Sequence, residues 1–145
     1  MLPPFNDAGD LPEGIHPADW NEIEMRLGKS SKRRSQAFAK LRHLSELADR
    51  TGALARFLIF GSFVSAGLNP RDVDVVLVMK PDFRMEDAPR ESRTLFSHPD
   101  ADARFGASVF WVREGMLPEE LMRQFLETWQ TKRDGTKRGI LEVRP

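Results

Sequence analysis

A glycine-serine pair and two closely spaced aspartates are the residues whose types and spacing could do chemistry in this chain. Gly61 and Ser62 follow a short apolar run, and nine residues separate Ser62 from Asp72. Glycine has no Cβ, so backbone N–H groups beside it can approach a bound anion closely. The Ser62 hydroxyl adds a donor, and a helical turn starting at Phe63 would point its N-terminus at the anion. The pair therefore predicts a site for a nucleotide phosphate.

Asp72 and Asp74 begin a second apolar run and supply the acidic half of the predicted site. Side chains alternate along a strand, so these two carboxylates lie on one face. Mg²⁺ (or Mn²⁺) prefers a few carboxylates together with water and substrate phosphates. A phosphate-binding turn beside paired acids is what metal-assisted nucleotidyl transfer needs, because the metal neutralises the triphosphate and orients its leaving pyrophosphate. We predict that Asp72 and Asp74 are the metal-binding and catalytic residues.

The same residues carry a resemblance to known proteins. Gly61-Ser62, the nine-residue spacing and Asp72-Val73-Asp74 in an apolar strand resemble the signature of the DNA-polymerase-β-like nucleotidyltransferase superfamily. With the segments 11–17 and 137–140, the chain also looks like a family of short bacterial nucleotidyltransferase-like proteins of unknown function. The resemblance implies transfer of a nucleoside monophosphate from a triphosphate to a hydroxyl of a protein, a small molecule or an RNA. Many small superfamily members pair with a helical partner in toxin–antitoxin modules, a role that the resemblance allows here.

One position departs from the superfamily pattern. Members usually carry a third carboxylate on a neighbouring strand, and the alignment puts Ser108 there. A serine cannot hold magnesium as a carboxylate does. Asp100, Asp102 or Glu114 could compensate if the backbone bends suitably. Two readings therefore stay open: a working enzyme, or a degenerate binding module that acts through a protein partner or a homodimer.

Composition narrows the class of protein. The 145 residues suit one domain, with residues 1–16 as an irregular, Pro- and Gly-rich lead-in and 17–145 as a single nucleotidyltransferase-like domain. Lys and Arg total 22, as do Asp and Glu, so a strong overall attraction to nucleic acid is not expected. The chain has no cysteine, which excludes disulfides and thiolate zinc sites. No apolar run approaches the roughly 20 residues of a membrane span, and no secretory signal is visible, so we expect no membrane contact and a cytoplasmic location.

Periodicity predicts the elements that must position the site. We expect an α/β (α+β) fold, a small mixed sheet with helices packed on it. Helices are predicted over 18–27, with Pro17 in the first turn, from a cap at Ser30 or Ser31 to about 50, over 89–97 and over 118–130. Strands are predicted over 56–60, 73–79 and 107–112, with an edge strand over 140–143 and a helical turn over 63–67.

Two charged groups and the aromatic residues have an ordinary structural explanation. Lys29, Lys32, Arg33 and Arg34 suit a solvated surface, as does the group Lys132, Arg133, Lys137 and Arg138. The alternative is that the second group reaches triphosphate or RNA phosphates. The aromatic residues favour core packing, although one could stack on a base. They are Phe57, Phe60, Phe110, Trp111, Phe125 and Trp129.

Overall fold

A five-stranded mixed sheet forms the centre of the computed structural model, which describes residues 1–144. The strands lie in the order β1-β5-β2-β3-β4. Neighbours β1–β5 and β3–β4 run parallel, whereas β2 runs antiparallel to both β3 and β5. The predicted α/β class, a mixed sheet with helices packed on it, is confirmed. The strands are β1 (Ile15–Ala18), β2 (Leu54–Phe60), β3 (Val73–Met79), β4 (Ala107–Arg113) and β5 (Ile140–Val143).

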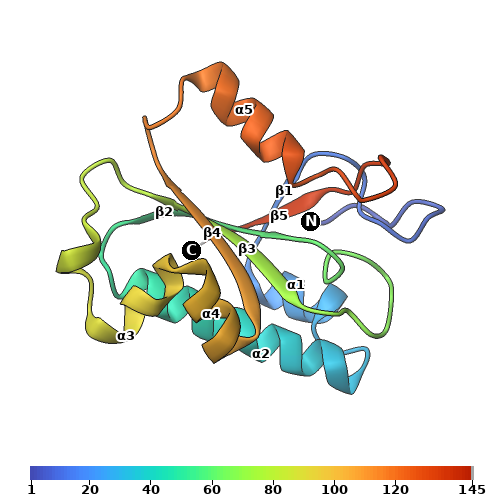
Figure 1. The fold of residues 1–145 in the computed structure, drawn as a ribbon. Coiled ribbons are helices and arrows are strands. Elements are labelled where there is room, and N and C mark those ends of the chain that lie inside the picture. The colour runs from blue at the N-terminus through green and yellow to red at the C-terminus, as the bar shows by residue number, and fades with distance from the viewer. Residues whose placement is uncertain (145) are drawn as a thin grey trace.

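Helices cover both faces of the sheet unequally. Four of them pack on one face, and α5 lies alone across the other (Figure 1). The helices are α1 (Trp20–Leu27), α2 (Lys32–Asp49), α3 (Arg90–Arg93), α4 (His98–Phe105) and α5 (Glu119–Thr128). Two apolar clusters result, a larger one under α1, α2 and α4 and a smaller one under α5. No helix within residues 1–144 combines the length and apolarity that crossing a bilayer requires.

Strand β3 connects the two clusters because it is buried on both sides. Val73, Val75 and Leu77 join the larger cluster, whereas Val76 and Val78 join the smaller one. Asp74 shares the face of Val76 and Val78, since side chains alternate along a strand. The α5 face of the sheet therefore begins with a carboxylate and continues as packed core.

The N-terminal part of the chain differs from the sequence prediction. Pro17 lies in strand β1 and does not start a helix. Helix α1 starts at Trp20, and its cap is Asp19, which accepts a hydrogen bond from the backbone N–H of Glu22 at 2.8 Å. Strand β1 pairs in parallel with β5. As a result β5, predicted as an edge strand, lies inside the sheet, and the short β1 with its Pro17 takes the edge, where proline is tolerated.

The segment after β2 is a turn and not a helix. The N–H of Val64 donates to the carbonyl of Gly61 at 3.0 Å, and the Ser65 hydroxyl donates to the carbonyl of Ser62 at 2.7 Å. No helix spans 63–67, so the expected helix N-terminus at Phe63 is wrong. The backbone N–H groups of this turn therefore lack the common direction and the dipole of a helix N-terminus.

Arg34 explains how this turn is held, and it corrects the prediction of a solvated surface. The side chain is 1% exposed. Its guanidinium donates to the carbonyls of Gly67 at 2.7 Å and Phe63 at 2.9 Å, and also to that of Ser65. A buried cation is tolerated only when its donors are satisfied. Arg34 therefore fixes the loop that carries Ser62 from inside the fold.

Candidate functional site

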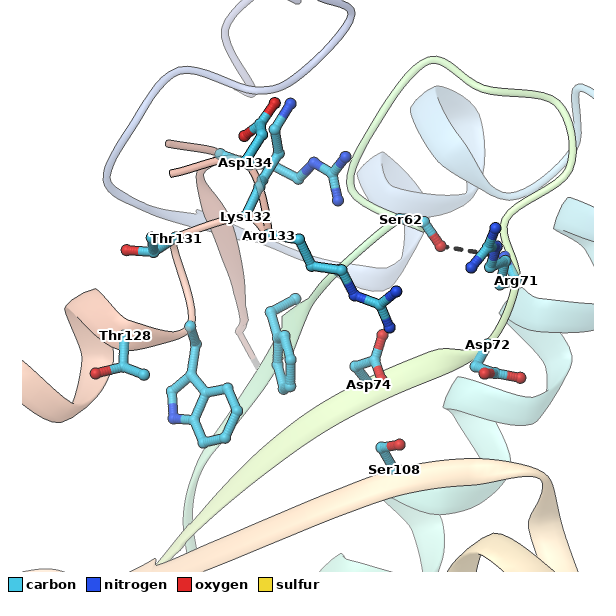
Figure 2. Close-up of a pocket in the computed structure, with 14 residues that line it drawn as sticks. Ser62, Arg71, Asp72, Asp74, Ser108, Thr128, Thr131, Lys132, Arg133 and Asp134 are labelled. Atoms are coloured by element: carbon cyan, nitrogen blue, oxygen red, sulfur yellow. Dashed lines mark hydrogen bonds between the residues drawn. The ribbon is translucent and has the colours of Figure 1, made fainter. Parts of the chain in front are cut away.

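A pocket of about 760 Å³ opens on the α5 face, where β3 begins and where the chain leaves α5. It brings together all five residues that the sequence singled out: Gly61, Ser62, Asp72, Asp74 and Ser108. Figure 2 shows the two aspartates, Ser62 and Ser108 around one end of the pocket, with the segment after α5 opposite them. The other lining residues are Phe60, Arg71, Thr128, Trp129, Thr131, Lys132, Arg133, Asp134 and Arg138.

Sheet register places the central carboxylate between two side chains. Asp74 pairs with Phe60 on β2 and with Ser108 on β4. Side chains directly opposite on adjacent strands share a face and lie close together. Ser108 thus stands beside Asp74, at the neighbouring-strand position that the alignment assigned to it.

Gly61 makes room for Asp74. Its φ is +84°, in the region that favours glycine, and a Cβ built there would lie 2.2 Å from Oδ2 of Asp74. No Cβ occupies such a distance, so any side chain would push the carboxylate away. This steric role is visible in the contacts, whereas the sequence argument assigned Gly61 only to phosphate approach.

Gly61→Ala is expected to lower the free energy of unfolding and to displace Asp74. The backbone strain of alanine in the left-handed region costs about 1–2 kcal/mol, and the overlap with Asp74 adds to it. Gly52→Ala is the matched control, because Gly52 has φ +71° but nothing within 4 Å of its Cβ position. Urea denaturation of both variants measures the difference. Equal losses in the two would contradict the proposed contact.

Ionisation of Asp74 is disfavoured by its surroundings. Burial raises the pKa of Asp74 to about 6, and the negative charge of Asp72 adds to the rise. The Ser108 hydroxyl and the positive charge of Arg138 lower the pKa in part. The two carboxylates therefore repel each other in a partly dry site, and a bound cation would relieve that repulsion.

Asp74→Asn is expected to stabilise the metal-free protein at pH 8. The folded pKa lies above the ordinary value of 3.8. The associated stability is therefore present below pH 4 and is lost as the pH rises through 6. The ionised carboxylate costs about 2–3 kcal/mol at pH 8, and asparagine avoids that cost. Chemical denaturation at pH 4, 6 and 8 measures the gain, with Asp102→Asn, at an exposed position of α4, as the control. A variant less stable than wild type at every pH would refute the account.

A hydrogen bond joins Ser62, just after β2, to the segment that leads into β3. The Ser62 hydroxyl accepts a hydrogen bond from the backbone N–H of Arg71 at 3.1 Å, drawn as a dashed line in Figure 2. This bond closes the turn between Gly61 and Asp72. Ser62 therefore has a structural role and is also a candidate hydrogen-bond donor to a phosphate, since it lines the pocket.

Four cationic side chains line the pocket. Lys132 and Arg138 are held by Asp10, a lead-in residue that is 2% exposed. Lys132 Nζ lies 2.7 Å from Oδ2 of Asp10, and Arg138 Nε lies 2.6 Å from Oδ1. Arg71 and Arg133 form no ion pair with residues 1–144, so their charge is available to an anionic ligand.

Asp10 organises this basic side of the pocket. Burial raises the pKa of Asp10, but hydrogen bonds and charge from Lys132 and Arg138 outweigh it and hold the pKa below its usual value. The backbone of the lead-in adds bonds to both sides of the pocket, from Ala66 N–H to the carbonyl of Gly9 at 2.8 Å and from Gly139 N–H to that of Leu11 at 2.9 Å. The lead-in thus fixes the basic segment 131–138 against the loop of Ser62.

The carboxylates of the pocket suit a magnesium ion whose remaining ligands come from water and a phosphate. Within residues 1–144 no three acidic or histidine side chains gather into a protein-only metal site. None of Asp100, Asp102 and Glu114 lines the pocket, so none takes the place of the acid missing at Ser108. Asp134 lines the opposite side of the pocket, so Asp72 and Asp74 are the two carboxylates at this end. Mg²⁺ in such sites completes its shell with water and substrate oxygens.

Sequence reasoning missed residues that reach the pocket from distant segments. Thr128, Thr131 and Asp134 line it from the end of α5 and the segment that follows, and Asp10 supports it from the lead-in. Arg71, next to Asp72, also lines it. Three members of the C-terminal basic group, Lys132, Arg133 and Arg138, line the pocket, which the alternative of phosphate binding requires. The composition of that group was a usable signal. Nothing in the sequence paired Asp10 with residues more than 120 positions away.

Comparison with known proteins identifies a family. No curated protein and no solved structure matches the chain. A family of unknown function (DUF6932) matches residues 3–144, which is nearly the whole chain and includes every pocket residue. The protein therefore belongs to this family of unknown function, DUF6932.

Proposed function

We propose that this protein is a nucleotidyltransferase that binds a nucleoside triphosphate with Mg²⁺ (or Mn²⁺) and transfers the nucleoside monophosphate to a hydroxyl. The observation that carries the proposal is one pocket with paired carboxylates at one end and cationic side chains facing them. In a metal-bound triphosphate the cation would meet the carboxylates and the negative phosphates would meet the cationic side chains. The resemblance in the Gly-Ser and Asp-x-Asp residues supports the same reading.

Each group of residues has a distinct task in this proposal. Asp72 and Asp74 would hold the metal, which when bound neutralises the phosphates and stabilises the leaving pyrophosphate. Ser62 and the N–H groups of its turn donate to phosphate oxygens. Arg71 and Arg133 donate charge-assisted hydrogen bonds to the phosphate oxygens, and these are stronger than bonds from neutral side chains.

The reaction balances without a further reactant. The acceptor oxygen forms a bond to the α-phosphorus, the bond from that phosphorus to the pyrophosphate oxygen breaks, and the hydroxyl proton passes to solvent. The acceptor is a protein side chain, a small molecule or an RNA end. The protein would act in the cytoplasm, where a toxin–antitoxin module is one setting for such an activity.

A labelled-nucleotide assay tests the proposal. ATP and GTP labelled at the α-phosphate are incubated with the protein, Mg²⁺ and a cell extract as the source of acceptors. We expect label in a larger product, with equimolar pyrophosphate, and no transfer by Asp72→Ala/Asp74→Ala. Circular dichroism checks that the double variant is folded. Undiminished transfer by the folded double variant would overturn the assignment.

A second candidate function has its own observation. Ser108 lies directly opposite Asp74 in the register, and no acid from its neighbourhood in the sequence lines the pocket. A site with two acids can bind a nucleotide and yet lack transfer, and the protein would then act through a protein partner or a homodimer. Nucleotide binding without turnover, together with stoichiometric co-purification of one partner, would favour this candidate over the enzyme.

A further inference from the structure

The pocket has an aromatic end that the ionic groups leave unexplained. Phe60 and Trp129 both line it, and their ring centroids lie 4.7 Å apart with planes inclined at 38°. Phe110 supports Trp129 from the β4 side at 4.5 Å. Because Phe60 pairs with Asp74 in the sheet register, the aromatic end begins directly beside the carboxylates.

The indole of Trp129 carries a donor that its packing among the described residues leaves unpaired. Trp129 is half-buried, and its Nε1 is shielded from solvent but meets no acceptor among residues 1–144. A buried donor without a partner destabilises the fold. Phenylalanine would fill much of the same space between Phe60, Phe110 and Phe125 without that cost. The indole thus presents a large aromatic surface at the pocket, and its donor is satisfied by nothing in the described part of the chain.

We infer that Trp129, backed by Phe60 and Phe110, is a stacking platform for the nucleobase of the bound nucleotide. The inference rests on the proposed function for the ionic end and adds a recognition site to it. A ligand with a polyanionic head and a flat ring would span the pocket from the Asp72–Asp74 end to the indole. Stacking is tolerant of base identity because every base has a π-face, so the platform selects nucleotides over free polyphosphates and discriminates weakly between bases.

Trp129→Leu and Trp129→Phe test this with two probes, Mg–ATP and Mg–tripolyphosphate, measured by calorimetry. We expect Trp129→Leu to weaken Mg–ATP binding by about 10-fold or more and Trp129→Phe by only a few fold. Both variants should bind Mg–tripolyphosphate within about 2-fold of wild type, since that probe has no base. Circular dichroism checks that both variants are folded.

Fluorescence gives a second readout that a structural role would not move. The chain holds three tryptophans, and Trp20 and Trp111 pack in the larger cluster on the opposite face of the sheet. ATP should quench the wild-type emission, and the quenching should disappear in Trp129→Phe, where the two other indoles remain. Tripolyphosphate should not quench either protein.

The outcomes separate this inference from the proposed function. Mg–ATP and Mg–tripolyphosphate of equal affinity, or unchanged ATP binding by Trp129→Leu, would overturn the platform and leave the ionic site standing. Adenosine that quenches Trp129 without any magnesium-dependent binding of ATP would support the platform and overturn the proposed function. Loss of both probes in folded Trp129→Phe would also overturn the platform, because the indole would then shape the ionic end.

Discussion

Asp74→Asn is expected to weaken the binding of Mg–ATP by about 100-fold or more, while the variant stays folded. Asparagine keeps the shape that fits over Gly61, but it removes the charge that would hold the cation. Since the same variant is expected to gain stability at pH 8, loss of binding could not be attributed to unfolding. Asp134→Asn is the matched control, because Asp134 lines the same pocket on the opposite side (Figure 2). Calorimetry should show less than about a 3-fold change for the control. Equal affinities for wild type and Asp74→Asn would remove Asp74 from the site.

The wild type should lose affinity in a similar way as the pH falls. With the pKa of Asp74 at about 6, the carboxylate is mostly ionised at pH 7 and mostly protonated at pH 5. Magnesium-dependent binding should therefore fall about 10-fold between these values. Phosphate groups titrate in the same range, so the parallel titration of Asp74→Asn supplies the correction.

Ser108→Asp is expected to raise the affinity for Mg²⁺ or Mn²⁺ by about 10-fold. The new carboxylate would stand beside Asp74 in the sheet register and add a third acid to this end of the pocket. The metal-free variant should be less stable, because a further negative charge joins two carboxylates that already repel. Ser108→Asn, which adds similar bulk without charge, is the control. Unchanged metal affinity in Ser108→Asp would mean that position 108 does not share a site with Asp74.

Transfer by the same variant bears on the two candidate functions. A large rise in labelled transfer with Ser108→Asp would mark the natural protein as a degenerate form of an enzyme and favour the binding module. A fall below the wild-type rate would mean that Ser108 belongs to a working site and would favour the enzyme. Both assays use the labelled nucleotide described above.

Local signals in the sequence predicted the central strands and helices well. Strand β3 was predicted with its observed bounds because its Val and Leu run is unbroken, and Ser31 caps α2 by accepting from the N–H of Arg34. The co-location of Gly61 and Asp74 also followed from local pattern, since both stand at strand ends. The close contact between them, in which the Asp74 carboxylate occupies the space that a side chain at position 61 would need, is visible only in the folded structure.

Long-range pairings were the part that sequence could not give. Parallel pairing of β1 with β5 joins segments at opposite ends of the chain. Strand β5 was predicted over 140–143, whereas the four-residue β1 was missed and its pairing left no local signal. Helix α4 was missed because its sequence is polar and weakly periodic. Asp10 looked like one more acidic residue in an irregular lead-in, although it holds two cations of the pocket. Burial and partners of this kind depend on the assembled fold.

The most direct test of the central claim is a calorimetric titration of the wild type with ATP and GTP, with Mg²⁺ and then with EDTA. Paired carboxylates facing cationic side chains predict binding at least about 10-fold tighter with the metal. That result would establish a metal–nucleotide site and justify the search for an acceptor. Binding that is absent, or equal in Mg²⁺ and EDTA, would contradict the account, and the pocket would then serve another ligand.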